Sequence, residues 1–324
     1  MNNINLNRIS LQELIDIEKI ISNNYSISIE NYADINILNK VNSILNKLDL
    51  PVSLVLDGYS ESKDDVNFVT SINIIKHISN VKKIYIRAIN DAEVSDINDF
   101  CEIKTLVECG LRSNFKKGMV LTPLEKYHKL EKFEFDNGFN KKQQEILPKF
   151  SKLKELITSN LSLSFSCTLP CLETIRIYED IKEIDLIAEK FPYIKNVYFE
   201  KCKSITDLSP ITKLSSIKSI WLRYMKHISV ITKFKTPESV TLFQMTNIPK
   251  LKKIDPIFDL NNLEGLMLTE LEDLKVEDFN KLSNLKNLKV VFITLKNRKE
   301  NERMEKFITS HGWNYIQPGL VGLE

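Results

Sequence analysis

The 324-residue sequence has few of the residues on which common phosphate-binding and nucleic-acid-binding motifs depend. Its 8 Gly residues form neither a GxGxxG nor a GxxxxGK[ST] loop, which excludes the two commonest phosphate-cradling loops. Of the 45 Lys and Arg residues only seven are Arg, so bidentate guanidinium contacts to phosphates and bases are scarce. The net charge of +2 gives no broad field for nucleic acid or an anionic membrane. We therefore expect neither among the partners.

Patterns typical of disulfides and metal sites are also missing. The five Cys residues form no CxxC pair, and the four His residues are far apart, without HExxH or HxH spacing. Cys167 and Cys171 lie close together but have no accompanying ligands, so we interpret them as small apolar residues rather than as a redox pair or half of a metal site. The sequence predicts no metal, no cofactor and a reducing compartment.

Long apolar runs are absent as well. No stretch reaches the 18 or so apolar residues that a transmembrane helix needs. The N-terminus lacks a basic segment followed by an apolar one, so we expect no signal peptide. These features predict a soluble, cytoplasmic protein.

The main feature that is present is an internal repeat of the form LxxLxxLxL, in which L is any sizeable apolar residue. A clear copy is Leu214-Ile217-Ile220-Leu222. Three copies place Pro after a polar residue at a helix start, at Pro123, Pro210 and Pro256, which predicts short helices or turns between strands. We place the third apolar position of eleven copies at residues 54, 84, 106, 133, 156, 175, 197, 220, 240, 266 and 288.

This spacing and the segment from Cys202 to Leu222 resemble the leucine-rich repeat family, in its short bacterial, internalin-like type. The resemblance covers about residues 48 to 293. It implies an α/β solenoid with a parallel β-sheet on the concave face and short helices or turns on the convex face. The family usually has Asn or Cys three residues after the strand; Cys202 fits, whereas Met225 and Leu271 do not, so we expect an irregular solenoid.

The two ends of the chain differ from the repeats. Ser10 to Glu13 is a capping box before apolar residues at helical spacing, and residues 35–48 form a second amphipathic pattern. After the repeats, residues 296–310 are a charged helix candidate. We predict a helical N-terminal cap at 1–47, a solenoid of about eleven irregular repeats at 48–293 and a C-terminal cap at 294–324, since solenoid ends need a polar outer face.

The repeat register also predicts which side chains leave the core. Residues that alternate with the core positions of a strand point away from the core, toward the concave side. Four successive repeats place an aromatic residue there, with Arg and Met beside them, and these types are enriched in protein interfaces. The alternatives are that the rings only pack on one another, or that the register is shifted and Trp221 is core. The predicted protein-binding residues are Arg176, Tyr178, Tyr198, Trp221, Arg223, Phe243 and Met267.

We interpret the chain as a non-enzymatic scaffold that binds another protein through the concave face. An immunity or inhibitor protein against a toxin needs only such a rigid surface. A host-directed bacterial effector or adaptor is the alternative within this class, and an enzyme with a site assembled across repeats is the alternative from another class. The sequence identifies neither the partner nor the oligomeric state.

Overall fold

The computed structural model describes residues 2–6, 25–30, 35–48, 53–58, 73–88, 94, 96–112 and 115–315. The chain divides into two compact units, Met1–Thr158 (unit 1) and Ser159–Glu324 (unit 2). In both units a strand alternates with a short helix or a turn.

Unit 1 contains mostly strands and single-turn 3-10 helices (η). Its elements are β1 (Asn2–Asn5), β2 (Tyr25–Glu30), α2 (Ile35–Leu48), β3 (Ser53–Gly58), η2 (Asn73–Lys76), β4 (Lys83–Ala88), η3 (Asn98–Glu102), β5 (Glu108–Arg112), η4 (Thr122–Leu124), β6 (Lys132–Phe135) and η5 (Gln143–Lys149). Strand β7 (Glu155–Ser162) begins in unit 1 and ends in unit 2.

Unit 2 repeats the same alternation of strands with short helices. Its elements are β8 (Thr174–Lys182), η6 (Ile184–Leu186), α4 (Ile187–Lys190), β9 (Asn196–Glu200), α5 (Ser209–Thr212), β10 (Ser219–Arg223), η7 (Pro237–Ser239), β11 (Leu242–Thr246), η8 (Asp255–Asp259), β12 (Gly265–Leu271), η9 (Val276–Asn284), β13 (Val290–Leu295) and α6 (Arg298–Ser310). None of the helices in the described ranges is long and apolar enough to cross a bilayer.

Within each unit every strand pairs in parallel with the next strand of the sequence. Ile220 of β10 lies opposite Val197 of β9 on one side and Phe243 of β11 on the other. The residues two positions further on, Leu222 and its neighbours, lie opposite one another in the same way. Side chains of one strand alternate between the two faces of a sheet, so these apolar pairs form continuous rows on one face.

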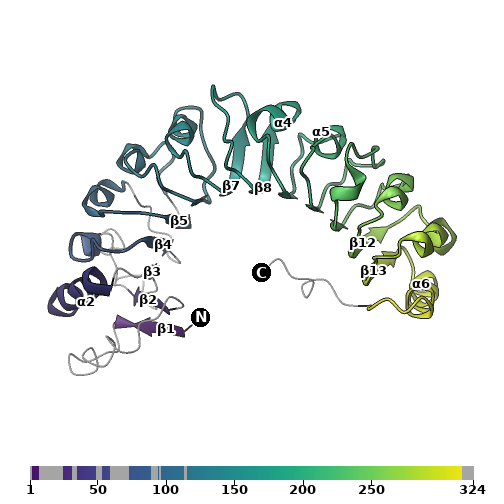
Figure 1. Ribbon diagram of the computed structural model, residues 1–324, viewed down its shortest axis with the longest axis horizontal. Helices are drawn as coiled ribbons and strands as arrows, with labels where there is room; N and C mark the ends of the chain where they lie inside the picture. The colour runs from purple at the N-terminus through teal and green to yellow at the C-terminus, as the bar shows by residue number, and fades with distance from the viewer. Residues whose placement is uncertain are drawn as a thin grey trace. The chain divides into compact units, whose positions relative to one another are not determined.

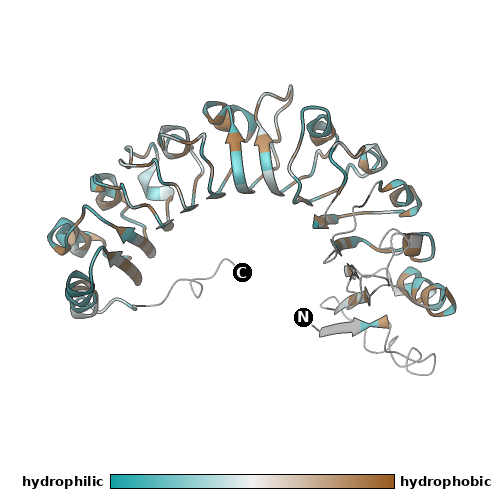
Figure 2. Ribbon diagram, turned by 180° about the vertical axis from the view of Figure 1, so that it is seen from behind, coloured by the Kyte–Doolittle hydropathy of each residue, from teal (hydrophilic) through white to brown (hydrophobic). Residues whose placement is uncertain are grey.

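These rows pack against the helices and form the core. Figure 1 shows the strands of each unit on one side and the helices on the other. Figure 2 shows apolar and polar residues alternating along the ribbon, as expected when each turn sends some side chains inward and others to solvent. Ile220, Leu222 and Phe243 are at most 1% exposed. Each unit is therefore an α/β solenoid with a parallel sheet, which confirms the predicted fold class. We call the sheet face turned away from the helices the open face; it is the concave face of the sequence prediction.

Three of the eleven predicted repeat copies are placed three residues too early. Strand pairing puts Cys109, Phe243 and Val291 in the rows occupied by Ile84, Ile220 and Leu266, rather than residues 106, 240 and 288. The corrected positions make the spacing more regular: residues 197, 220, 243 and 266 follow at intervals of 23. The other eight copies have the predicted register.

Four successive strands of unit 2, β9 to β12, share one backbone feature near their carboxyl ends. Four non-glycine residues have a left-handed conformation with φ between 57° and 59°, each four positions after the first core residue of its strand: Lys201, Tyr224, Asn247 and Glu270. The following residue points back into the core, as Cys202 and Met225 do at 2% exposure each. The predicted short helices begin where expected, with Pro123, Pro210 and Pro256 in the first turns of η4, α5 and η8.

The ends of the described chain extend the repeat pattern. In β2, Ile27 lies opposite Leu54 of β3, and Ile4 of β1 lies opposite Ile27, so the apolar row continues before residue 48. The helices expected near residues 35–48 and 296–310 are present as α2 and α6. The helix expected after Ser10 lies outside the described residues. The boundaries 1–47, 48–293 and 294–324 stay predictions.

Candidate functional site

The open face of unit 2 carries a file of aromatic side chains. Tyr178 on β8, Tyr198 on β9 and Trp221 on β10 come from three consecutive strands. The ring centroids of Tyr178 and Tyr198 are 5.5 Å apart, and those of Tyr198 and Trp221 are 4.7 Å apart, with interplanar angles of 61° and 84°. Such edge-to-face pairs favour a fixed arrangement of the rings. We call these three residues the aromatic file.

A polar cluster borders the aromatic file. The hydroxyl of Tyr198 donates to Glu200 at 2.6 Å, and the guanidinium of Arg223 lies 3.6 Å from the same carboxylate. Burial raises the pKa of the Tyr198 hydroxyl, and its hydrogen bond to Glu200 adds to that rise. The hydroxyl therefore stays protonated at neutral pH. Arg176 of β8 lies opposite Tyr198, so it belongs to the same face.

Next to the aromatic file, three buried polar atoms have no hydrogen-bond partner within the described part of the chain. They are Nε1 of Trp221, Nε2 of Gln244 and Oγ1 of Thr246. Trp221 lies directly opposite Gln244, and Thr246 is two residues further along β11 on the same face. Leaving a buried donor unpaired costs about 1–3 kcal/mol. We call these three atoms the unpaired donors. All three can donate a hydrogen bond, so the patch suits acceptor oxygens of a ligand.

Two of the predicted binding residues have different surroundings from those expected. Phe243 is fully buried and packs against Phe234, with ring centroids 5.9 Å apart, so its predicted place on the open face is wrong. Met267 lies on the open face opposite Gln244, but it is only 3% exposed. The structure therefore brings together Arg176, Tyr178, Tyr198, Trp221 and Arg223, and separates Phe243 from them.

Sequence reasoning missed Gln244, Thr246 and Phe292 on the open face. Each stands where the corrected register puts an outward residue, and Phe292 lies opposite Met267. The available signal was the interval of 23 residues: counting 23 from Trp221 gives Gln244, and counting 23 from Arg223 gives Thr246.

The open face of unit 1 carries ion pairs. Arg112 forms an ion pair with Glu134 through two guanidinium nitrogens, and Lys83 lies 2.7 Å from Glu108, which also accepts a hydrogen bond from Tyr85. Burial, together with the charge of Glu134, raises the pKa of Asp136 to about 6. Among the described residues, no three His, Cys, Asp or Glu side chains are grouped so that they could hold a metal ion.

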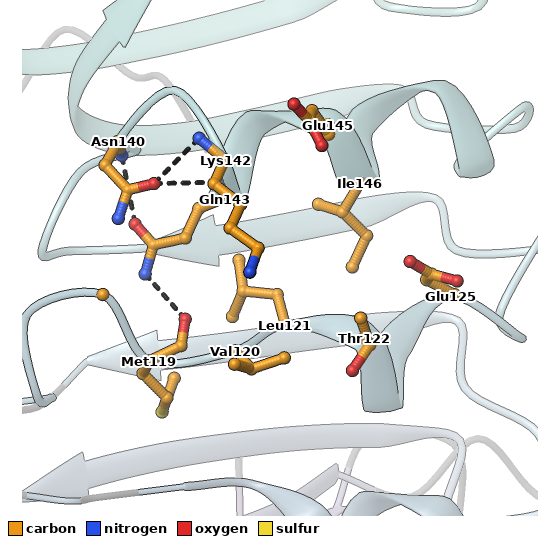
Figure 3. Close-up of a pocket in the computed structure, with 11 residues that line it drawn as sticks. Met119, Val120, Leu121, Thr122, Glu125, Asn140, Lys142, Gln143, Glu145 and Ile146 are labelled. Atoms are coloured by element: carbon orange, nitrogen blue, oxygen red, sulfur yellow. Dashed lines mark hydrogen bonds between the residues drawn. The ribbon is translucent and has the colours of Figure 1, made fainter.

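A small cavity of about 100 Å³ lies on the helix side of unit 1 (Figure 3). Asn140 Oδ1 accepts hydrogen bonds from the backbone of Lys142 and Gln143, and Gln143 Nε2 donates to the carbonyl of Met119 at 2.9 Å. Gln143 Oε1 accepts from the backbone of Asn140 at 3.0 Å. These hydrogen bonds satisfy polar groups of Asn140 and Gln143. The bond from Gln143 to Met119 also connects neighbouring repeats.

Comparison with solved structures finds proteins of similar fold. The fold is similar to that of a leucine-rich repeat protein of Leptospira interrogans, with a TM-score of 0.47 and 10% sequence identity, over 90% of this chain and 89% of that one. No family model matches the chain, and no curated protein matches its sequence. The fold class stated above therefore rests on the strand order, register and burial of this chain.

Proposed function

We propose that this chain is a non-enzymatic protein of the leucine-rich repeat type that binds another protein through the open face of unit 2. The observation that carries the proposal is the set of unpaired donors beside the aromatic file. Tyr, Trp and Arg dominate the centres of protein interfaces, where they are surrounded by contacts that exclude water. Acceptor oxygens of a partner would satisfy the donors and recover the free energy that their burial costs.

The geometry favours a partner that inserts an extended segment. Trp221 and Gln244 lie on neighbouring strands, about 5 Å apart, and Thr246 follows Gln244 by about 7 Å along β11. Backbone carbonyls of an extended chain, repeating on one side about every 7 Å, match this spacing. We infer that the side chains covering the unpaired donors move aside on binding, so that main-chain oxygens of the partner accept from these donors while an apolar side chain covers Trp221.

Within this class we propose a cytoplasmic immunity or inhibitor protein that neutralises a toxin. A rigid surface of preformed edge-to-face rings supports this role, because a rigid surface loses little conformational entropy on binding. The alternative is a host-directed bacterial effector or adaptor; gene neighbourhood and a secretion assay distinguish the two. An enzyme assembled across repeats is the alternative from another class, and the Glu134–Asp136 carboxyl pair of unit 1 is the feature that favours it.

The test is affinity capture with three matched baits from the native cell. The baits are the wild type, Trp221→Ala/Arg223→Ala on the open face, and Tyr193→Ala/Lys213→Ala as a control that also removes one aromatic and one cation. Tyr193 is 61% exposed just after α4, away from the sheet. We expect a protein that the wild type and the control retain and the open-face variant loses. Retention of the same proteins by all three baits would contradict binding through this face.

The donor role of Trp221 is tested by Trp221→Phe, which keeps an aromatic ring and removes the N–H. With the captured partner purified, hot-spot behaviour predicts a loss of about 2 kcal/mol or more for Trp221→Ala. Trp221→Phe should lose about 1 kcal/mol, the net value of one hydrogen bond. Isothermal titration calorimetry measures both. If Trp221→Phe and the wild type bound the partner with equal affinity, the contribution of Trp221 to the binding free energy would come from its ring alone.

A further inference from the structure

A pocket of about 300 Å³ lies at the carboxyl ends of β9 and β10 in unit 2, where both strands turn toward the helix side. This volume is at the lower end of the range for small-molecule sites. The aromatic file and the unpaired donors do not line it. Its lining residues are Lys201, Cys202, Lys203, Ile205, Tyr224, Met225, Lys226 and His227.

The left-handed turns shape the pocket. Lys201 and Tyr224 have φ values of 58° and 57°, and their N–H groups donate to the carbonyls of Arg223 and Thr246, each at 2.9 Å. Because these bonds hold each turn against the next repeat, the residue after each turn is directed inward. Cys202, Met225 and Ile205, each at most 2% exposed, therefore give the pocket an apolar floor.

The rim of the pocket is cationic. Three Lys residues and one His residue line it, and no acidic residue does. Lys201 lies 3.3 Å from Glu200, which is also the acidic partner of Arg223 at 3.6 Å, so one carboxylate is shared between two cations. In the described part of the chain, no acidic side chain lies within ion-pair distance of Lys203 or Lys226.

Two carboxylates, Glu200 and Asp180, lie near the pocket but do not line it, and they offset only part of the charge of its three Lys residues. Asp180 accepts hydrogen bonds from the backbone N–H and the hydroxyl of Ser204, at 3.0 and 2.7 Å. Burial raises the pKa of the Cys202 thiol, so the floor stays neutral. Two cations contact the ring of Tyr224, with Arg223 at 4.9 Å and Lys201 at 5.8 Å from its centroid. The pocket thus combines an apolar floor with a surplus of positive charge at the rim.

We propose that this pocket binds a small organic anion, with its apolar body against the half-buried ring of Tyr224 and its carboxylate or phosphate between Lys203 and Lys226. An apolar body alone would leave both ammonium groups without a counter-charge, and a bare anion would leave the ring of Tyr224 without an apolar contact. The site is separate from the proposed protein-binding face, and it does not depend on that function.

Four probes separate the two parts of this recognition: phenyl phosphate, benzoate, benzyl alcohol and inorganic phosphate, each titrated into the full chain by calorimetry. We expect phenyl phosphate, benzoate or both to bind, and benzyl alcohol and inorganic phosphate to bind about tenfold more weakly or not at all. The stronger of the two aromatic anions identifies the charged group. Absence of binding by both would overturn the proposal, as would equal binding of inorganic phosphate and phenyl phosphate.

Two pairs of variants locate the site. Lys203→Gln/Lys226→Gln should weaken the aromatic anion about tenfold, because it removes both unpaired cations of the rim. Lys213→Gln/Lys233→Gln removes the same charge from exposed positions elsewhere in unit 2, and should leave the affinity unchanged. If both pairs of substitutions weakened binding of the aromatic anion equally, the anion would be attracted by the net charge of the protein only. This result would contradict the proposed site. Trp221→Phe should leave the probe affinity unchanged, so failure of the protein-binding proposal is distinguishable from failure of this one.

Discussion

Position within a strand decides whether an aromatic side chain of this protein supports the fold or faces outward. Phe243 and Trp221 lie on neighbouring strands, yet Phe243 is fully buried and Trp221 is partly exposed. The two occupy different rows, because Phe243 lies opposite Ile220 whereas Trp221 lies opposite Gln244. A shift of one residue in a strand exchanges the two faces, so register determines the role of each ring.

The burial of Phe243 leads to a stability prediction. Phe243→Ala should lower the free energy of unfolding by about 3–5 kcal/mol, because it leaves a cavity beside Phe234. Trp221→Ala should cost less, since its side chain is partly exposed. Urea denaturation followed by circular dichroism measures both. A Phe243→Ala protein with wild-type stability would contradict the register of β11 and would restore Phe243 to the open face.

Asp136 should make unit 1 less stable as the pH rises. Its folded pKa of about 6 lies above the ordinary value of about 3.9, so between these values the folded state holds a proton that the unfolded state has lost. The contribution of Asp136 to stability is full below about pH 4 and is lost as the pH rises through 6. Relative to Asp136→Asn, the wild type should therefore lose thermal stability across this window.

Asp207→Asn is the matched control for this titration. Hydrogen bonds from Ser209 lower the pKa of the Asp207 carboxyl, so this residue stabilises the folded state once ionised, and the contribution is lost as the pH falls. As the pH rises, the wild type should therefore gain stability relative to Asp207→Asn, whereas it should lose stability relative to Asp136→Asn. Melting temperatures at pH values from about 2 to 8 test both carboxyls, because the contribution of Asp207 changes below its ordinary pKa of about 3.9 and that of Asp136 changes above it. If the difference in melting temperature between the wild type and Asp136→Asn did not vary with pH, this would contradict the raised pKa of Asp136.

Sequence alone predicted most of the outward residues but not their chemistry. Arg176, Tyr198 and Trp221 lie on the open face as expected, because strand alternation requires only a correct register. The unpaired donors could not be predicted, because they depend on which side chains of neighbouring repeats exclude water from each atom. Likewise, the raised pKa of Asp136 depends on its burial and on its distance in space from Glu134, which raises it, and from Arg112, which lowers it.

Among the secondary-structure elements, three strands were misplaced for a reason that lies in the repeat itself. In the pattern LxxLxxLxL the first three apolar positions are three residues apart, so a shift of three residues still fills two of the four positions. Val240 is an apolar residue of the repeat, but it precedes β11, and it was mistaken for the first core residue of that strand. A constant interval between repeats resolves this ambiguity, because only Phe243 lies 23 residues from both Ile220 and Leu266.

Close packing of β4 against β5 gives a prediction at the element scale. Gly110 lies opposite Tyr85, and a Cβ at Gly110 would overlap the Tyr85 ring. Gly110→Ala should therefore lower the free energy of unfolding by about 1–3 kcal/mol, the usual cost of overpacking. In the Tyr85→Ala background the same substitution should cost much less. Denaturation of the four proteins gives this double-mutant cycle, and additive effects would contradict the contact.

At the scale of the whole molecule, the described structure consists of two units in which each repeat is stabilised by its neighbours. Such stability is close to a sum of repeat and interface contributions. The regular core spacing of unit 2, at residues 197, 220, 243 and 266, means that consecutive repeats have equivalent positions. A whole repeat is then an interchangeable segment, provided that the strand register is preserved.

Deletion of one repeat tests this equivalence. Removing residues 218–240 joins Ile217 to Thr241 and brings Phe243 opposite Val197, so both core rows of unit 2 remain continuous. We expect this protein to fold cooperatively with lower stability, because one repeat and one interface are lost.

A shorter deletion serves as the control. Removing residues 221–240 joins Ile220 to Thr241 and puts Leu242 in the core row and Phe243 outside it. This 20-residue deletion should be far less stable although it removes fewer residues. Thermal unfolding by circular dichroism, with size-exclusion chromatography of the folded state, compares the two. If the 20-residue deletion were the more stable, the strands would follow the register with residue 240 in the core row, and the open face would have to be redrawn with Phe243 on it.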